Sequence, residues 1–333
     1  MSQPSFVRVR RARSARLRWS CVALCVVAAC HARTRGGEAS LPPGSSVEAI
    51  SLLGDSLRRP TPDSTVLARM EAQLADARRD ALARPNDADA LIWIGRRTAY
   101  LGRFREAVQI FSDGVRRFPN DARMYRHRGH RFITVRRFDD AIADFQRAAN
   151  LTAGMPDEIE PDGQPNARNT PIGSLQSNIW YHLALAHYLK GDFESAARAA
   201  RAGIQVSTNP DRLVSQTHWL YMALRRAGRN DEAAAALIPI RDDFDVIENG
   251  SYYRLLRMYK AGVSAAVMDS ALSAGVRSAA DASLAYGLAN WFLYSGDTAR
   301  AVRAYEQLMT GGQWPSFGYI AAEADLARLR RKQ

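Results

Sequence analysis

Histidines and carboxylates gather in the middle of the sequence. His127 and His130 are three positions apart, so on a helix they share one face and can bind the same metal ion. His182 follows later, and residues 152–176 before it contain four acids: Asp157, Glu158, Glu160 and Asp162. Histidines and carboxylates together serve as metal ligands or as an acid/base pair for hydrolysis. The residue types therefore permit a metal-binding or hydrolytic site here.

No sequence motif supports catalysis at these residues. The chain lacks the HExxH motif, a nucleophile elbow, a phosphate-binding glycine loop and any paired-cysteine motif. All three cysteines, Cys21, Cys25 and Cys30, lie in the first 30 residues, so the rest of the chain has no disulfide framework and no thiolate metal site. We therefore expect a protein that is not an enzyme and that needs no cofactor or metal.

Composition and net charge indicate the domain organisation and the kind of partner to expect. The chain has 333 residues, of which 47% are apolar, so two domains or an elongated repeat array are expected rather than disorder. The net charge is +12, but six arginines and no acid fall within the first 30 residues, which leaves +6 for the remainder. This excess is too small to indicate nucleic acid binding.

The first 30 residues are typical of an export signal. Residues 1–18 are basic, and residues 19–29 form an apolar stretch too short to span a bilayer. The stretch ends in Val27-Ala28-Ala29-Cys30, which resembles the lipobox of bacterial lipoproteins. The resemblance implies cleavage before Cys30 and lipidation of its sulfur. An ordinary secretory signal is the alternative.

Residues 31–63 are rich in glycine, proline, serine and arginine, which is typical of a flexible tether. With a lipidated Cys30, this tether predicts that residues 64–333 are anchored to a membrane of the cell envelope. His31 rather than aspartate follows the cysteine. By resemblance to bacterial lipoproteins, this favours the periplasmic face of the outer membrane if the cell has two membranes.

Self-similarity organises the rest of the chain. Six segments align on a turn followed by the start of a helix, and their first residues are Gly102, Arg136, Gly191, Gly228, Gly262 and Gly296. Successive starts are separated by 34, 55, 37, 34 and 34 residues. Small residues recur at a position where two helices cross closely: Gly95, Gly129, Ala184 and Ala289.

A period of 34 residues with a helix on each side of the turn resembles the tetratricopeptide repeat (TPR) family. Pro119 closes the first unit as the family's proline does, because it cannot continue a helix. Tyr221, Leu255 and Val267 replace small residues and predict altered packing in the fourth and fifth units. The resemblance implies an all-α, right-handed solenoid of helical hairpins, with about six repeats and a capping helix at each end.

The predicted solenoid covers residues 64–333. Its repeats lie near 88–121, 122–151, 177–213, 214–247, 248–281 and 282–315. An N-terminal helix begins at Ser64, and residues 316–333 form the C-terminal cap. Residues 152–176 interrupt the array with four prolines and four acids. This insertion is a lid over the groove, a metal or acid/base site with the histidines, or an inert loop.

By the same resemblance, the first helix of each unit lines a concave groove. The predicted partner-binding residues at its groove positions are Trp93, Arg96, Tyr100, Arg126, His127, His130, Asn178, Tyr181, His182, His218, Trp219, Arg225, Tyr252, Tyr253, Tyr259, Tyr286 and Asn290. Tyrosine and tryptophan offer flat apolar area with a polar tip, and arginine binds carboxylates. Packing between helices is the alternative role for tyrosines at this spacing.

The leading hypothesis is a lipid-anchored scaffold of the cell envelope that binds a peptide or protein segment in this groove. The alternatives are an envelope enzyme or a metal- or glycan-binding protein, which would use His127, His130 and His182 with the acidic insertion. A structural envelope component without a specific ligand is the third hypothesis. The sequence identifies neither the partner nor the oligomeric state.

Overall fold

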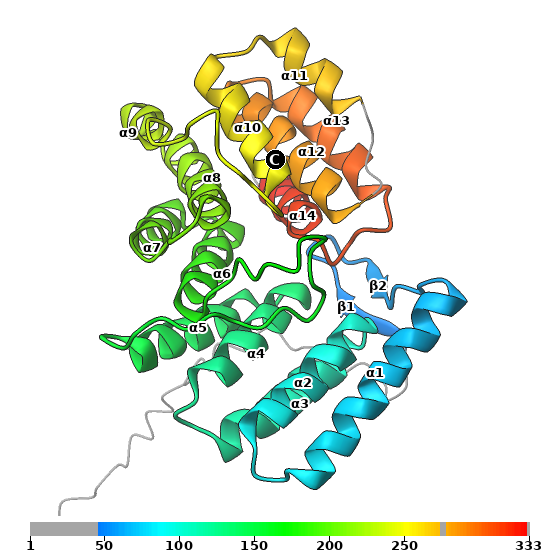
Figure 1. Ribbon diagram of the computed structural model, residues 1–333. Helices are drawn as coiled ribbons and strands as arrows, with labels where there is room; N and C mark the ends of the chain where they lie inside the picture. The colour runs from blue at the N-terminus through cyan, green and yellow to red at the C-terminus, as the bar shows by residue number, and fades with distance from the viewer. Residues whose placement is uncertain (1–45, 274–277, 332–333) are drawn as a thin grey trace, which may run out of the picture. The chain divides into compact units, whose positions relative to one another are not determined.

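The computed structural model describes residues 46–273 and 278–331 (Figure 1). These residues form fourteen helices and one two-stranded hairpin, which confirms the predicted all-α helical-repeat fold. The predicted signal peptide, Cys30 and the first part of the tether lie outside the described residues. Within the described ranges, no helix combines the length and apolar character that a membrane span requires.

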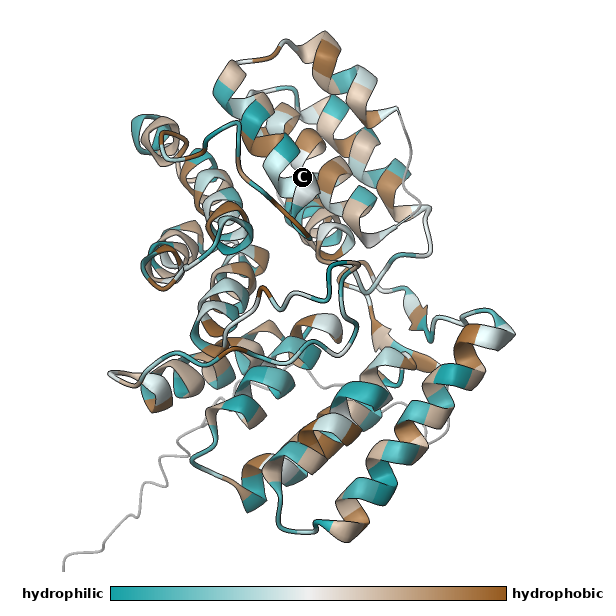
Figure 2. Cartoon of the chain, viewed as in Figure 1, coloured by the Kyte–Doolittle hydropathy of each residue, from teal (hydrophilic) through white to brown (hydrophobic). Residues whose placement is uncertain are grey.

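Six pairs of consecutive helices follow one another. Five of them pack as hairpins: α2 (Ala88–Tyr100) with α3 (Phe104–Arg117), α4 (Ala122–Thr134) with α5 (Phe138–Thr152), α6 (Leu175–Lys190) with α7 (Phe193–Gln205), α8 (Pro210–Arg226) with α9 (Asn230–Ala236), and α12 (Ala279–Tyr294) with α13 (Thr298–Met309). In the remaining pair, α10 (Gly250–Ala261) packs mainly against α8 and α12, and α11 (Ala265–Leu272) packs mainly against α12. Most helices carry both hydrophobic and hydrophilic residues (Figure 2). Each can therefore bury one face against its neighbours.

The six repeat turns share a left-handed residue. Positive φ angles between 63° and 96° occur at Gly102, Gly191, Gly228, Gly262 and Gly296. Glycine adopts this conformation without a Cβ penalty. The remaining turn has Arg136 at φ 67°. Its guanidinium donates to the Glu323 carboxylate at 2.6 Å and to the Trp314 carbonyl at 3.1 Å, a role glycine cannot fill.

Close helix crossings depend on the small residues of the repeat. A Cβ on Gly95 would lie 2.4 Å from the Phe111 ring, and one on Gly129 would lie 2.8 Å from the Phe145 ring. Phe111 of α3 and Phe145 of α5 therefore pack directly against the backbone of the preceding helix. Where Tyr221 and Leu255 replace the small residue, the second helices shorten to seven residues in α9 and eight in α11.

A β-hairpin occupies part of the predicted tether. Strand β1 (Val47–Ile50) pairs antiparallel with β2 (Ser56–Arg58). The buried Glu48 carboxylate accepts from the backbone N–H of Arg105 at 3.0 Å and pairs with Arg59 at 2.7 Å. The prediction of a flexible tether is therefore wrong for residues 46–59. Composition did not predict the hairpin because residues that stabilise it, such as Arg105, lie far away in the sequence.

Two further helices flank the repeats. Helix α1 (Ser64–Ala83) packs against α2, and its N-cap is Asp63, which accepts from the Val66 N–H at 2.9 Å, rather than Ser64. Helix α14 (Phe317–Arg330) packs against α12 and α13, as a cap would, and also against α6. Its contact with α6 changes the site that the sequence predicts.

Candidate functional site

Most of the predicted groove is closed. Eleven of the seventeen predicted partner-binding side chains are buried: Arg126, His127, Asn178, Tyr181, His182, His218, Trp219, Tyr252, Tyr259, Tyr286 and Asn290. The prediction that they face an open groove is wrong. The other six are only partly exposed: Trp93, Arg96, Tyr100, His130, Arg225 and Tyr253.

Contacts between first helices bury the aromatic residues. The hydroxyls of Tyr181 on α6 and Tyr252 on α10 share a hydrogen bond of 2.9 Å. His218 of α8 stacks on Tyr252, with ring centroids 4.3 Å apart. The Tyr286 hydroxyl on α12 donates to the Asp325 carboxylate of α14 at 2.8 Å. These tyrosines pack between helices, which is the alternative that the sequence left open.

Helix α14 closes the groove from its other side. The Phe317 ring lies 5.4 Å from the ring of His130 and 5.6 Å from that of His182. Further along α14, the fully buried Asp325 carboxylate pairs with Arg226 at 2.9 Å and with Arg328 at 2.6 Å. Burial alone would raise the pKa of Asp325, but the two guanidiniums hold it below its usual value. The cap helix thus occupies the space that a bound segment was predicted to fill.

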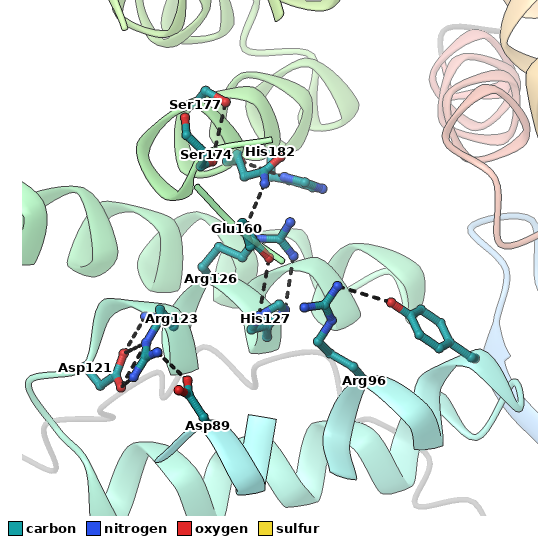
Figure 3. Close-up of polar contacts among 12 residues, drawn as sticks. Asp89, Arg96, Asp121, Arg123, Arg126, His127, Glu160, Ser174, Ser177 and His182 are labelled. Carbon is teal, nitrogen blue, oxygen red and sulfur yellow. Dashed lines mark hydrogen bonds and ion pairs between the residues drawn. The ribbon is translucent and has the colours of Figure 1, made fainter. Parts of the chain in front are cut away.

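The insertion covers α4 and α6. Its two ends meet at a bridge between Ile159 and Ser174. Between these ends, the Glu160 carboxylate lies 3.0 Å from Arg126 Nε and 3.4 Å from His127 Nε2 (Figure 3), and it accepts from Asn178 Nδ2 at 2.6 Å. Of the interpretations left open by the sequence, these contacts favour the lid.

The histidines are held neutral by their surroundings. Burial, together with the charges of nearby arginines, lowers the pKa of His127, His130 and His182 well below the usual histidine value. The rings of His130 and His182 lie 4.6 Å apart. Across residues 46–273 and 278–331, no group of three or more metal-ligating side chains is arranged to hold an ion. The metal-site interpretation therefore has no geometric support in this part of the chain.

A small cavity remains between α2 and α4. Its volume is about 130 Å³, and its lining residues are Arg96, Ala99, Tyr100, Phe111, Arg126, His127, His130 and Arg131. Arg96 donates to the Tyr100 hydroxyl at 3.4 Å and lies over the Trp93 ring at 4.4 Å. Burial lowers the pKa of Arg131 to about 10, and that of Arg126 is also lowered. The cavity is therefore strongly cationic.

A second, open hollow lies between α1 and α2. It has a volume of about 460 Å³ and is lined by Gln73, Asp76, Ala77, Arg79, Asp80, Trp93 and Arg97. Arg97 lies over the Trp93 ring at 5.1 Å and donates to Gln73 Oε1 at 3.1 Å and to the Gly163 carbonyl at 2.9 Å. This hollow brings an aromatic ring and a cation together at a surface that α14 does not cover.

The sequence prediction missed three residues of these sites. Arg97 and Arg131 are not groove positions of the repeat, and Glu160 was one of four equivalent acids in the insertion. A signal for the cationic cavity was present: the thirteen residues of α4 contain four arginines and two histidines, and no acid. Such a charge run usually faces solvent, but here part of it turns inward.

No family model matches the chain, and no curated protein matches its sequence. Solved structures of similar shape include MamA, with 16% identity, 60% of this chain and 89% of that chain covered, and a TM-score of 0.40. YrrB, described as a TPR protein with an unusual peptide-binding site, has 12% identity, covers 77% and 98%, and has a TM-score of 0.39. TPR-like repeats of a Podosopora anserina putative kinesin light chain have 16% identity, cover 68% and 95%, and have a TM-score of 0.39. At these identities and TM-scores, the alignments identify no partner or activity for this chain.

Proposed function

We propose that this chain is a non-catalytic, lipid-anchored scaffold of the cell envelope, which binds a peptide or protein segment at α1 and α2. The observation that carries the proposal is the contrast between the two halves of the predicted groove. In the later repeats, tyrosines and histidines are buried by their neighbours and by α14. In the first repeat, Trp93, Arg96 and Tyr100 remain partly exposed beside the open hollow of about 460 Å³.

The chemistry of this surface suits an acidic, extended segment. Trp93 lies beneath Arg96 and Arg97, so the surface offers cations on an aromatic base. The acids at the rim already have partners: Asp76 pairs with Arg79, and Asp80 pairs with Arg84 at 3.1 Å. Among the described residues, Arg97 donates to neutral groups, namely Gln73 Oε1 and the Gly163 carbonyl. Its charge is therefore available to a carboxylate of the partner.

Site-specific crosslinking tests this surface. A photo-crosslinking amino acid at the position of Trp93 is compared with one at Arg257, which is exposed on α10. We expect an adduct with an envelope protein from the first position, at least five-fold more abundant than from the second. The Arg97→Ala substitution should lower the yield of the adduct at position 93, since it removes the cation beside Trp93. Equal adducts at both positions, or none at the first, contradict the proposed surface.

The anchor is supported by the sequence alone. Val27-Ala28-Ala29-Cys30 follows a basic segment and a short apolar stretch, as in bacterial lipoproteins. Sixteen residues separate Cys30 from Val47 of β1. Fully extended, they span about 60 Å, so the repeats would work close to the membrane surface.

Replacing the cysteine tests the anchor. Lipid chains contribute about 0.8 kcal/mol of membrane-binding free energy per buried methylene group. A protein exported by a conventional signal lacks these chains. We therefore expect Cys30→Ala to move the protein from the membrane fraction to the soluble fraction. A variant that remains fully in the membrane fraction contradicts lipidation at this residue, whatever the outcome at Trp93.

A further inference from the structure

The cavity between α2 and α4 holds more positive than negative charge. Arg96, Arg126 and Arg131 line it, and Glu160 provides the one carboxylate within ion-pair distance of them among the described residues. Arg212 and Asp162 also act on this cluster, but their charges are opposite and leave the balance unchanged. The cavity therefore carries an excess of about two positive charges in a small space.

The guanidiniums of Arg126, which is buried, and of Arg131, which is partly exposed, are incompletely satisfied. Arg126 is only 9% exposed. Its Nε lies 3.0 Å from Glu160, close enough for an ion pair, but without the alignment of a hydrogen bond. Its Nη1 lies 3.1 Å from His127 Nδ1, which accepts from it as a neutral ring. Arg131 has no carboxylate partner among the described residues, and its guanidinium lies 5.6 Å from the Phe104 ring. Buried charges without partners cost several kcal/mol each.

The cavity is built for one compact group. Its volume of about 130 Å³ is small beside the 460 Å³ of the open hollow between α1 and α2. The insertion covers this region: a Cβ on Gly163 would lie 2.0 Å from the Tyr100 hydroxyl and 2.9 Å from Arg96. So small a space suits a small molecule or a single terminal group better than an extended chain.

We infer that this cavity is a binding site for a phosphate-type dianion, free or as a phosphomonoester, held by Arg96, Arg126 and Arg131. Guanidinium forks donate pairs of hydrogen bonds to phosphate oxygens. A dianion neutralises the excess of two charges, which a monocarboxylate does not. Glu160 shows that the cluster already accepts one oxyanion, at its edge toward α6. The site adjoins the proposed peptide surface and shares Arg96 with it, whereas Arg131 lines the cavity alone.

The test is binding of inorganic phosphate to the full-length protein in detergent. We expect the unfolding temperature to rise with the logarithm of phosphate concentration, and chloride at the same ionic strength to give no such rise. A phosphomonoester such as glycerol phosphate forms the second arm, and succinate and acetate form the third. Tighter binding of the ester than of phosphate identifies a phosphomonoester ligand, and the reverse identifies the free anion.

Matched variants locate the site. Arg131→Gln removes one cavity charge and should weaken phosphate binding at least ten-fold. Without ligand it should unfold at about the same temperature, because Arg131 has no carboxylate partner among the described residues to lose. Arg257→Gln, on exposed α10, should bind phosphate like the parent protein.

Three results overturn the inference. The first is an absence of phosphate and phosphomonoester binding by the parent protein, which needs no variant to fold. The second is unchanged affinity in Arg131→Gln. Stronger binding of the carboxylates than of phosphate also contradicts it. The phosphate-binding measurement does not depend on crosslinking at position 93. Failure of the proposed surface can therefore be distinguished from failure of the anion site.

Discussion

Four histidines lie in surroundings that disfavour their protonation. Burial lowers the pKa of His218 to about 3, and neither of its ring nitrogens has a hydrogen-bond partner among the described residues. The pKa values of His127, His130 and His182 are lowered by burial and by the charges of Arg96, Arg126, Arg131 and Arg212, against which Glu160 acts from the insertion. These rings are therefore neutral in the folded protein at pH 7.

Because these pKa values are depressed on folding, the unfolded chain binds more protons below pH 6.5, and stability is lost as the pH falls through that value. We expect the free energy of unfolding to decrease by about 1 kcal/mol per buried histidine between pH 7.5 and pH 5.5. Urea unfolding at several pH values measures this.

One substitution isolates the contribution of a single histidine to this pH-dependent loss of stability. His218→Phe keeps an aromatic ring against Tyr252 and removes the titrating group. It should reduce the pH-dependent loss by about 1 kcal/mol while leaving stability at pH 7.5 unchanged or higher. A pH profile identical to that of the parent protein would show that His218 is not buried neutral.

Arg136 combines a strained backbone with a buried ion pair. Arg136→Gly would relieve about 1 kcal/mol of strain at φ 67°, but it would leave the buried Glu323 carboxylate without its guanidinium. Removal of one partner of a buried pair costs about 3–5 kcal/mol, so we expect a net loss of about 2–4 kcal/mol in the free energy of unfolding. A stabilised variant would contradict the role of this contact. The repeat pattern predicts the turn here, but not why arginine replaces glycine.

At the scale of helices, the crossings depend on the absence of a side chain. Alanine normally favours a helix over glycine by about 1 kcal/mol. Gly129→Ala should nevertheless destabilise the protein by about 1–3 kcal/mol, because the new methyl group would meet the Phe145 ring at 2.8 Å. Gly250→Ala is the matched control: it begins α10 with no atom within 4 Å, and should be neutral or mildly stabilising. Thermal unfolding compares the two, and equal effects would contradict the close crossing.

Local signals predicted the elements that depend on neighbours in sequence. The 34-residue period located the six turns, and each has its left-handed residue at the first position of the aligned segment. The period also located the small residues of the crossings. It failed for the β-hairpin, where Leu52 N–H donates to Glu323 at 2.6 Å across 271 positions. No local pattern in residues 46–59 encodes so distant a partner.

At the scale of the folded unit, the position of α14 decides which surface is available. The sequence predicted a C-terminal cap at residues 316–333, but it did not reveal that α14 is buried along the whole run from Gly318 to Ala327, two acids included. Glu323 pairs with Arg136, and Asp325 pairs with Arg226 and Arg328. Burial of acids is expensive unless such partners exist, and they come from α8 and from the turn before α5. Only the assembled structure brings them together.

The closed groove predicts a strong effect of the Asp325 charge. Asp325→Asn keeps the size of the side chain but leaves Arg226 and Arg328 without their carboxylate. We expect a loss of about 3–5 kcal/mol in the free energy of unfolding, measured by urea titration at pH 7. Asp242→Asn, at an exposed pair with Arg257, should change it by less than about 1 kcal/mol. Similar losses in both would contradict the burial of Asp325.

Hydrogen exchange of the α14 backbone amides shows whether the protein's own cap helix fills the later part of the groove. We expect the amides of residues 320–327 to exchange nearly as slowly as those of α6 and α8, with free energies of opening close to that of global unfolding. Exchange of the α14 amides within seconds, with α6 and α8 still protected, would contradict this and show that the helix leaves the groove open. The tyrosines and histidines would then be candidates for a binding surface again.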